Sequence, residues 1–106
     1  MKFNIDDYVG KYVMHCRTQE DADMFCEYLS SVGKTWRGGT RYVGHTNYHM
    51  YGDSMCYDFQ NGQYCHVEYF IDHGYEILEF DDFIFDDYEA DIQFSFDEMF
   101  GGTNEV

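Results

Sequence analysis

Carboxylates are the most numerous chemically active side chains of this sequence, and they gather toward its C-terminal end. Residues 75–100 combine ten acidic residues with eight aromatic rings and contain no lysine or arginine. Such carboxylates can meet a basic surface, and the rings between them add apolar contact area. The stretch therefore predicts a partner-binding surface. Its candidate residues are Asp81, Asp82, Asp86, Asp87, Glu89 and Asp91 for charge, with Phe83, Phe85 and Tyr88 as anchors.

The charge is divided unevenly along the chain. All six basic residues lie at or before Arg41, where six acidic residues balance them, so the segment beyond Arg41 carries the entire net charge of −15. Nucleic acids and anionic membranes are themselves negative, and this charge disfavours both as direct partners. A basic protein surface or a cation is favoured instead.

Cysteine and histidine offer a second chemistry. The adjacent pairs His15-Cys16 and Cys65-His66 contain metal-ligand types, but the sequence has no Cys-x₂-Cys spacing of a zinc site. Residues 81–89 likewise lack the alternating ligands and central glycine of an EF-hand. We expect no metal or other cofactor, although zinc binding by the cysteines and histidines stays open. The remaining residues of these types are Cys26, Cys56, His45, His49 and His73.

Catalytic motifs are missing from the sequence. It has no nucleophile elbow, no phosphate-binding glycine loop and no zinc-protease helix. We therefore expect a binding protein and not an enzyme. The acidic residues near Met1 do not resemble a signal peptide, and no apolar run approaches the length of a membrane span. These features predict a cytoplasmic protein with reduced cysteines.

Local patterns predict the elements that must position these residues. Residues 11–16 are typical of a strand. Thr18 then resembles a helix N-cap, the apolar spacing of Ala22, Phe25, Cys26 and Leu29 predicts one buried helical face, and Gly33 is a candidate C′ glycine. Trp36 begins a second extended segment. Further predictions are a strand or long loop over 41–51, a short apolar segment at 54–59, a turn at 61–62, a helix over 63–73, a strand at 75–80, another strand at 92–96 and a frayed end at 101–106.

A short internal repeat relates the two predicted helices. Glu27-Tyr28 precedes Gly33 at the same spacing as Glu68-Tyr69 precedes Gly74, and an extended segment follows each glycine. Two helix–Gly–strand units, each preceded by a strand, predict the ferredoxin-like order βαββαβ: an α+β fold with an antiparallel sheet and both helices on one face. We expect one domain over 1–106, with a core fold over 1–83 and an acidic extension over 84–106.

Residues 11–36 (KYVMHCRTQEDADMFCEYLSSVGKTW), together with residues 74–83 (GYEILEFDDF), resemble small proteins encoded by phages and prophages of Firmicutes and gut bacteria. The resemblance implies a phage origin and a small α+β fold, and it brings no catalytic residues. The acidic segment beyond Phe83 departs from that pattern. Small, very acidic phage proteins often inhibit host defence, and they include anti-CRISPR proteins that occupy DNA-binding channels.

Three interpretations of the acidic stretch follow. Duplex DNA carries a charge about every 1.7 Å of its axis, so carboxylates on a rigid element can occupy the same basic groove of a host protein, such as a CRISPR effector nuclease. This DNA mimicry is the favoured function. The stretch can also be a solvated face that keeps an aromatic-rich protein in solution. The third interpretation is a phage structural or interaction module without nucleic-acid competition.

Overall fold

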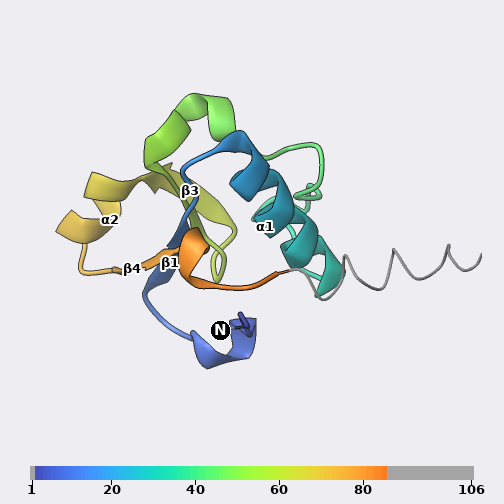
Figure 1. Ribbon diagram of the computed structural model, residues 1–106, viewed down its shortest axis with the longest axis horizontal. Coiled ribbons are helices and arrows are strands. Elements are labelled where there is room, and N and C mark those ends of the chain that lie inside the picture. The colour runs from blue at the N-terminus through green and yellow to red at the C-terminus, as the bar shows by residue number, and fades with distance from the viewer. Residues whose placement is uncertain (1, 86–106) are drawn as a thin grey trace, which may run out of the picture.

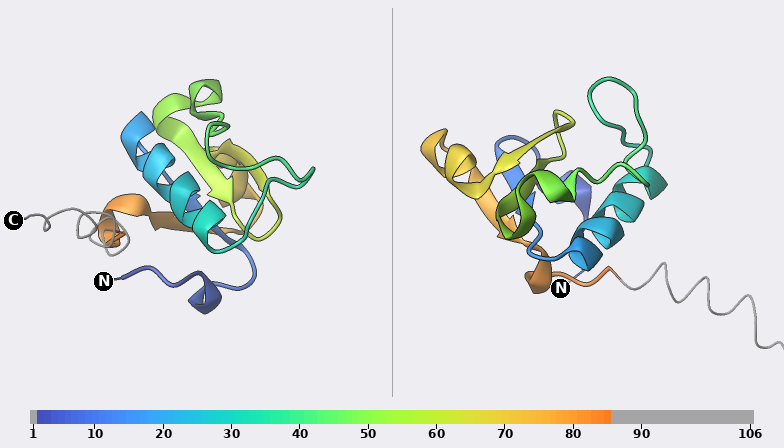
Figure 2. Two further views of the ribbon diagram at one scale, coloured as in Figure 1. Left: turned by 90° about the vertical axis from the view of Figure 1, so that its right-hand side faces the viewer. Right: turned by 90° about the horizontal axis from the view of Figure 1, so that it is seen from above.

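The computed structural model describes residues 2–85, which form a four-stranded mixed sheet with one helix on each face (Figures 1 and 2). This confirms the predicted α+β class. The elements follow one another as β1 (Tyr12–His15), α1 (Gln19–Ser31), β2 (Met55–Asp58), β3 (Gln63–His66), α2 (Val67–Asp72) and β4 (Glu76–Glu79). Short 3₁₀ helices span Ile5–Asp7, Tyr48–Met50, Gly52–Ser54 and Phe80–Asp82.

The strands lie in the order β3-β2-β1-β4. Strand β1 pairs antiparallel with β2, and β2 pairs antiparallel with β3, but β1 pairs in parallel with β4. The predicted antiparallel sheet is therefore wrong, and the ferredoxin-like strand order is not confirmed. The cause is the β3-α2-β4 connection, because a helical crossover returns the chain in its original direction at the far edge of the sheet.

The two helices cover opposite faces of the sheet, and not one face as predicted. Neighbouring strand residues point to opposite faces. Accordingly Val13 packs in a small cluster with Phe70 of α2, whereas Met14 packs in the large cluster that contains Phe25 of α1. Both figures show α1 and α2 separated by the strands. Each face of the sheet thus has its own core.

Helix α1 forms where the sequence predicts it. Its N-cap is Thr18, whose side-chain oxygen accepts a hydrogen bond from the Asp21 N–H at 3.1 Å. All four residues of the predicted apolar face are buried: Ala22, Phe25, Cys26 and Leu29. Gly33 ends the helix with a φ of 84°, a left-handed conformation that glycine adopts without a steric penalty.

The internal repeat corresponds to a shared way of ending a helix. Lys34 N–H donates to the Leu29 carbonyl at 2.9 Å, and Tyr75 N–H donates to the Phe70 carbonyl at 2.9 Å. Both are the six-to-one hydrogen bond of a Schellman motif around a left-handed glycine, Gly33 or Gly74. In each helix the apolar residue after the repeated tyrosine is the acceptor, and it is buried.

Two of the predicted elements differ in the structure. Residues 63–66, predicted as helix, form β3, because they pair with all four residues of β2 and the helix begins only at Val67. Ile71 shared the helical spacing that suggested a longer helix, yet it is 56% exposed. The segment that begins at Trp36 is not a strand but a loop, closed by an isolated bridge between Thr35 and Arg41.

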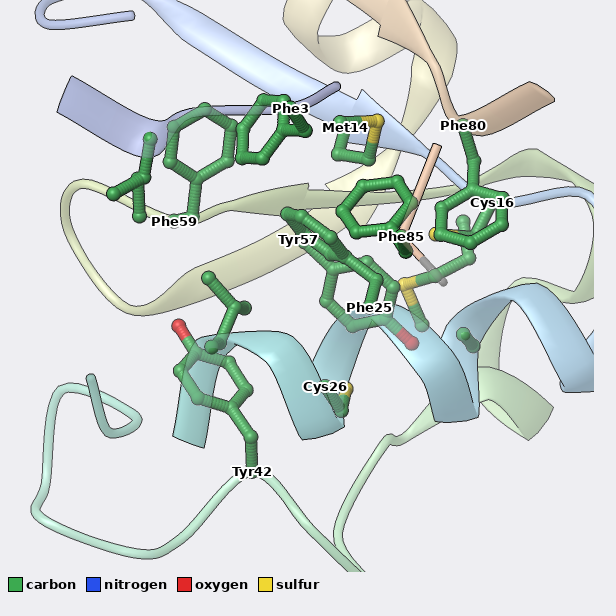
Figure 3. Packing of buried hydrophobic residues seen from close by; sticks show 14 of the residues in the cluster. Phe3, Met14, Cys16, Phe25, Cys26, Tyr42, Tyr57, Phe59, Phe80 and Phe85 are labelled. Carbon is green, nitrogen blue, oxygen red and sulfur yellow. The ribbon is translucent and has the colours of Figure 1, made fainter. Parts of the chain in front are cut away.

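The larger core is rich in aromatic rings and includes the end of the described chain. Figure 3 shows the Phe25 ring extending from α1 toward the strands and the ring of Phe85. Phe85 stacks on Phe80 with ring centroids 4.5 Å apart and planes 2° apart. Ile84 forms a parallel bridge with Lys2. Ile84 and Phe85 thus take part in the packing of the described fold.

Candidate functional site

One end of the sheet gathers the C-terminal ends of its two parallel strands. Strand β1 ends at His15 and β4 ends at Glu79, and the two residues are direct partners in the register. The chain then leads from β1 into the first turn of α1 and from β4 into the 3₁₀ helix Phe80–Asp82. Parallel pairing therefore places side chains from distant parts of the sequence at the same end of the sheet.

Glu79 contacts both Arg17 and His15 at this end of the sheet, and we call these three side chains the tie. Its carboxylate accepts hydrogen bonds from Arg17 Nε at 3.1 Å and from an Arg17 terminal nitrogen at 3.3 Å, and His15 Nδ1 lies 3.0 Å from it. The other ring nitrogen of His15 donates to the Asp53 carbonyl at 2.7 Å. Burial by itself raises the pKa of Glu79, but the hydrogen bonds from Arg17 and His15 outweigh it and lower that pKa.

Five further carboxylates belong to the segments that meet at this end of the sheet, and we call them the acidic end. Asp21, at the start of α1, has a raised pKa. Burial is the larger cause, and the negative charge of Asp81 is the next. Because the pair with Glu79 already occupies Arg17, this end keeps a surplus of negative charge. The members of the acidic end are Glu20, Asp21, Asp53, Asp81 and Asp82; all are exposed except Asp21, which is half-buried.

The predicted site residues divide into three groups. Asp81 and Asp82 are exposed at the acidic end, as a binding role requires. Phe85 is buried, and half-buried Phe83 lies 5.1 Å from the Phe3 ring, so both rings pack in the core and are not free as anchors. The other predicted site residues lie outside the described residues: Asp86, Asp87, Tyr88, Glu89 and Asp91. The predicted strand at 92–96 and the frayed end at 101–106 also lie there.

Sequence reasoning missed three members of the acidic end. These three are Glu20, Asp21 and Asp53. The missing signal was the parallel pairing of β1 with β4, which brings the start of α1 close to Asp81. No spacing in the sequence encodes that pairing.

A groove of about 600 Å³ lies at the other end of the sheet, beside edge strand β3. Trp36 and Tyr64 contribute one pair of its rings, with centroids 5.5 Å apart. Phe70 and Tyr75 contribute another, with centroids 4.9 Å apart, and Tyr69 lies 5.3 Å from Phe70. The rings of this groove come from separate segments, so no local pattern in the sequence predicts it.

The cysteines behave as core residues. Cys16, Cys26 and Cys56 are fully buried and Cys65 is partly exposed, and all four are free thiols. Burial raises the pKa of Cys26 and of Cys56 to about 12, which keeps both thiols protonated. Within residues 2–85 no three side chains among histidine, cysteine, aspartate and glutamate are arranged to hold a metal ion.

Comparisons of the chain with protein-family models, with curated proteins and with solved structures find no match. Across residues 2–85, neither helix has the length and apolar character needed to cross a bilayer.

Proposed function

We propose that this chain is an acidic, phage-type inhibitor that binds a basic nucleic-acid-binding surface of a host defence protein in the bacterial cytoplasm. A CRISPR effector nuclease is the partner class that we would test first. The supporting observation is the acidic end itself, where carboxylates from three separate segments surround a sheet end whose arginine is already paired. The proposed action is stoichiometric binding and not catalysis.

The electrostatics of the chain suit this role. A net charge of −15 attracts a basic protein from a distance and speeds the encounter at low salt. Asp81 and Asp82 belong to a 3₁₀ helix that begins with the buried ring of Phe80, so their positions are set by the core. Carboxylates held in this way lose little conformational freedom on binding, which favours affinity.

The chain continues from Phe85 into four of the predicted carboxylates: Asp86, Asp87, Glu89 and Asp91. Phe85 stacks on Phe80, the residue before Asp81. We therefore include these four residues in the proposed interface. They would extend the array of negative charge that the acidic end begins.

The experiment measures DNA binding by a purified, guide-loaded CRISPR effector nuclease in the presence of the protein. The natural chain should compete with DNA. One variant neutralises the exposed members of the acidic end (Glu20→Gln, Asp53→Asn, Asp81→Asn, Asp82→Asn). A second neutralises the following segment (Asp86→Asn, Asp87→Asn, Glu89→Gln, Asp91→Asn). Competition should fall strongly in at least one of them.

The matched control removes the same charge from exposed positions elsewhere (Asp6→Asn, Glu68→Gln, Asp72→Asn, Glu76→Gln). It should compete nearly as well as the natural chain. If the control and both test variants lose competition equally, only the net charge matters and there is no defined interface. If the natural chain competes with DNA on no nuclease of a representative panel, the proposal is wrong.

The groove beside β3 favours a second candidate, a phage structural or interaction module without nucleic-acid competition. Edge strand β3 has a pairing partner on one side only, and aromatic rings adjoin it. Native mass spectrometry tests this candidate. A stable homo-oligomer that leaves every tested nuclease active would support it against the inhibitor.

A further inference from the structure

The groove beside β3 combines aromatic rings with one buried carboxylate. Asp58, at the end of β2, is 1% exposed and lies among the residues that line the groove. It is the direct partner of Gln63 on β3, so both side chains point to the α2 face of the sheet, where Phe70 also packs. A buried aspartate thus lies among the residues that line a groove rich in aromatic rings.

The local contacts of Asp58 leave its charge without a cation. One carboxylate oxygen accepts the Asn61 N–H at 3.3 Å, and the other accepts the Asn61 side-chain amide at 3.0 Å. Tyr75, another groove residue, is close enough for Asp58 to raise its pKa, after the larger effect of burial. Within residues 2–85 no ion pair joins Asp58 to a basic side chain. A buried carboxylate without a counter-ion is costly, and a bound cation would relieve that cost.

The aromatic rings favour the same kind of ligand. The face of an aromatic ring attracts a cation, and several rings around one site form the usual binding place for alkylated ammonium and guanidinium groups. The net charge of −15 adds a field that concentrates cations at the protein. The Lys11 ammonium already lies 5.5 Å from the centroid of the Tyr75 ring, another groove residue. The Asp58 carboxylate and the overall negative field both disfavour an anion.

We propose that this groove binds an organic cation, either a guanidinium or an alkylammonium group, between its aromatic rings and the Asp58 carboxylate. The arginine or lysine side chain of a protein segment and a free small cation share this chemistry. The site is independent of the acidic end, which lies at the opposite end of the strands. The proposal therefore does not depend on nuclease inhibition.

Replacing Arg37 removes a positive charge from the groove, so its effect on cation binding should be opposite to that of replacing Asp58. Arg37 lines the groove, its side chain is exposed, and its backbone N–H is held by the Gly62 carbonyl at 3.0 Å. A positive side chain at the rim should repel a cationic ligand. Arg37→Gln should therefore strengthen binding of a cation, whereas it would weaken binding of an anion.

Isothermal titration calorimetry of the full chain with N-acetyl-arginine amide tests the proposal. The neutral citrulline analogue is the control ligand, and tetramethylammonium is the alkylammonium probe. Binding of arginine amide or tetramethylammonium, with none of the citrulline analogue, is the expected result. Asp58→Asn should weaken binding about tenfold or more, because a buried charge pair is lost.

Two further variants guard against misinterpretation. Glu68→Gln removes the same charge from exposed α2 outside the groove and should change affinity little. Because Asp58→Asn alters a residue that anchors the β2–β3 turn, Tyr69→Leu tests the site without touching the carboxylate. Tyr69 is 42% exposed, and its loss should weaken binding several-fold through the missing ring face.

The source of the cation is resolved by comparing arginine amide with a short extended peptide that contains one arginine. Much tighter binding of the peptide identifies a protein segment, and equal binding identifies a free cation. The proposal is overturned if neither cation binds, if the citrulline analogue binds equally, or if Glu68→Gln weakens binding as much as Asp58→Asn.

Discussion

The two faces of the sheet are covered by helices of different lengths, since α1 has 13 residues and α2 has 6. On the α1 face the buried cluster includes rings from the N-terminal segment, the helix, the strands and the chain end, such as Phe3, Phe25 and Phe85. On the α2 face the buried cluster contains Val13, Cys56 and Phe70. The larger cluster fills the α1 face, and the groove lies between the two clusters, with Trp36 and Tyr64 on the α1 side and Phe70 on the α2 side.

The largest expected difference between the faces comes from truncating one central ring on each. Phe25→Ala should cost about 3–5 kcal/mol of unfolding free energy, because five other rings lie around Phe25 in a fully packed cluster. Phe70→Ala should cost less, about 2–3 kcal/mol, since its small cluster can relax. Urea denaturation measures both. Equal losses would show that the two faces are equally important to stability.

Gly62 lies in the turn between β2 and β3, and this turn contacts the loop that carries Trp36. A Cβ there would lie 2.5 Å from the Arg37 backbone nitrogen, and Gly62 also has a φ of 69°. Gly62→Ala should destabilise by about 2–4 kcal/mol through clash and backbone strain together. Gly44→Ala is the control, because Gly44 has a similar φ of 80° with nothing within 4 Å of a Cβ. Thermal melts should show the clash as the difference between the two variants.

The helix caps give a smaller contrast. Thr18 caps α1, and the His66 ring nitrogen Nδ1 caps α2 by accepting the Tyr69 N–H at 3.1 Å. Thr18→Ala should lower global stability by about 1 kcal/mol, because α1 unfolds with the main core. His66→Ala should mainly speed amide exchange within α2. The contrast fails if His66→Ala lowers global stability as much as Thr18→Ala.

The tie at the acidic end predicts a pH effect of modest size. The pKa of Glu79 is lowered in the fold, so its contribution to stability is complete above the ordinary value of 4.5 and disappears as the pH falls through the lowered value. Glu79→Gln should therefore flatten the loss of stability below about pH 5. Thermal melts from pH 7 to pH 3 measure this, with Glu76→Gln as the control on the same strand. Identical profiles for the two variants would contradict the role of the tie.

The reaction rates of the cysteine thiols report how accessible each cysteine is in the folded protein. Cys65 adjoins the α2-face cluster and is partly exposed, whereas Cys16, Cys26 and Cys56 are fully buried. A thiol reagent under native conditions should modify one site quickly, and Cys65→Ser should abolish that phase. The other three thiols should react only on unfolding. Rapid modification of two or more sites in the natural chain would show that the cores open readily.

The parts of the fold that local chemistry controls were predictable. The cap at Thr18, the buried face of α1 and the glycine at 33 lie within one helix, so adjacent residues carry all the information. Strands β1 and β4 were also predicted, because apolar β-forming residues follow a glycine in each case. The internal repeat matched two identical helix endings for the same local reason.

Strand pairing was decided only in three dimensions. The spacing in residues 63–73 suits a helix, but pairing with β2 turns residues 63–66 into a strand. Likewise nothing local distinguishes an exposed anchor from a core ring, and Phe85 became a core ring because Phe80 and Phe25 lie beside it.

The sequence by itself determined the charge of this protein, its segregation beyond Arg41 and the most regular helix, because these depend on composition and near-neighbour spacing. The tertiary structure decided that the acids of α1 lie close to those after β4, and that rings of separate segments line one groove with Asp58. Both outcomes require contacts between residues far apart in the chain. Such contacts are chosen by the packing of the whole fold, and no local pattern records them.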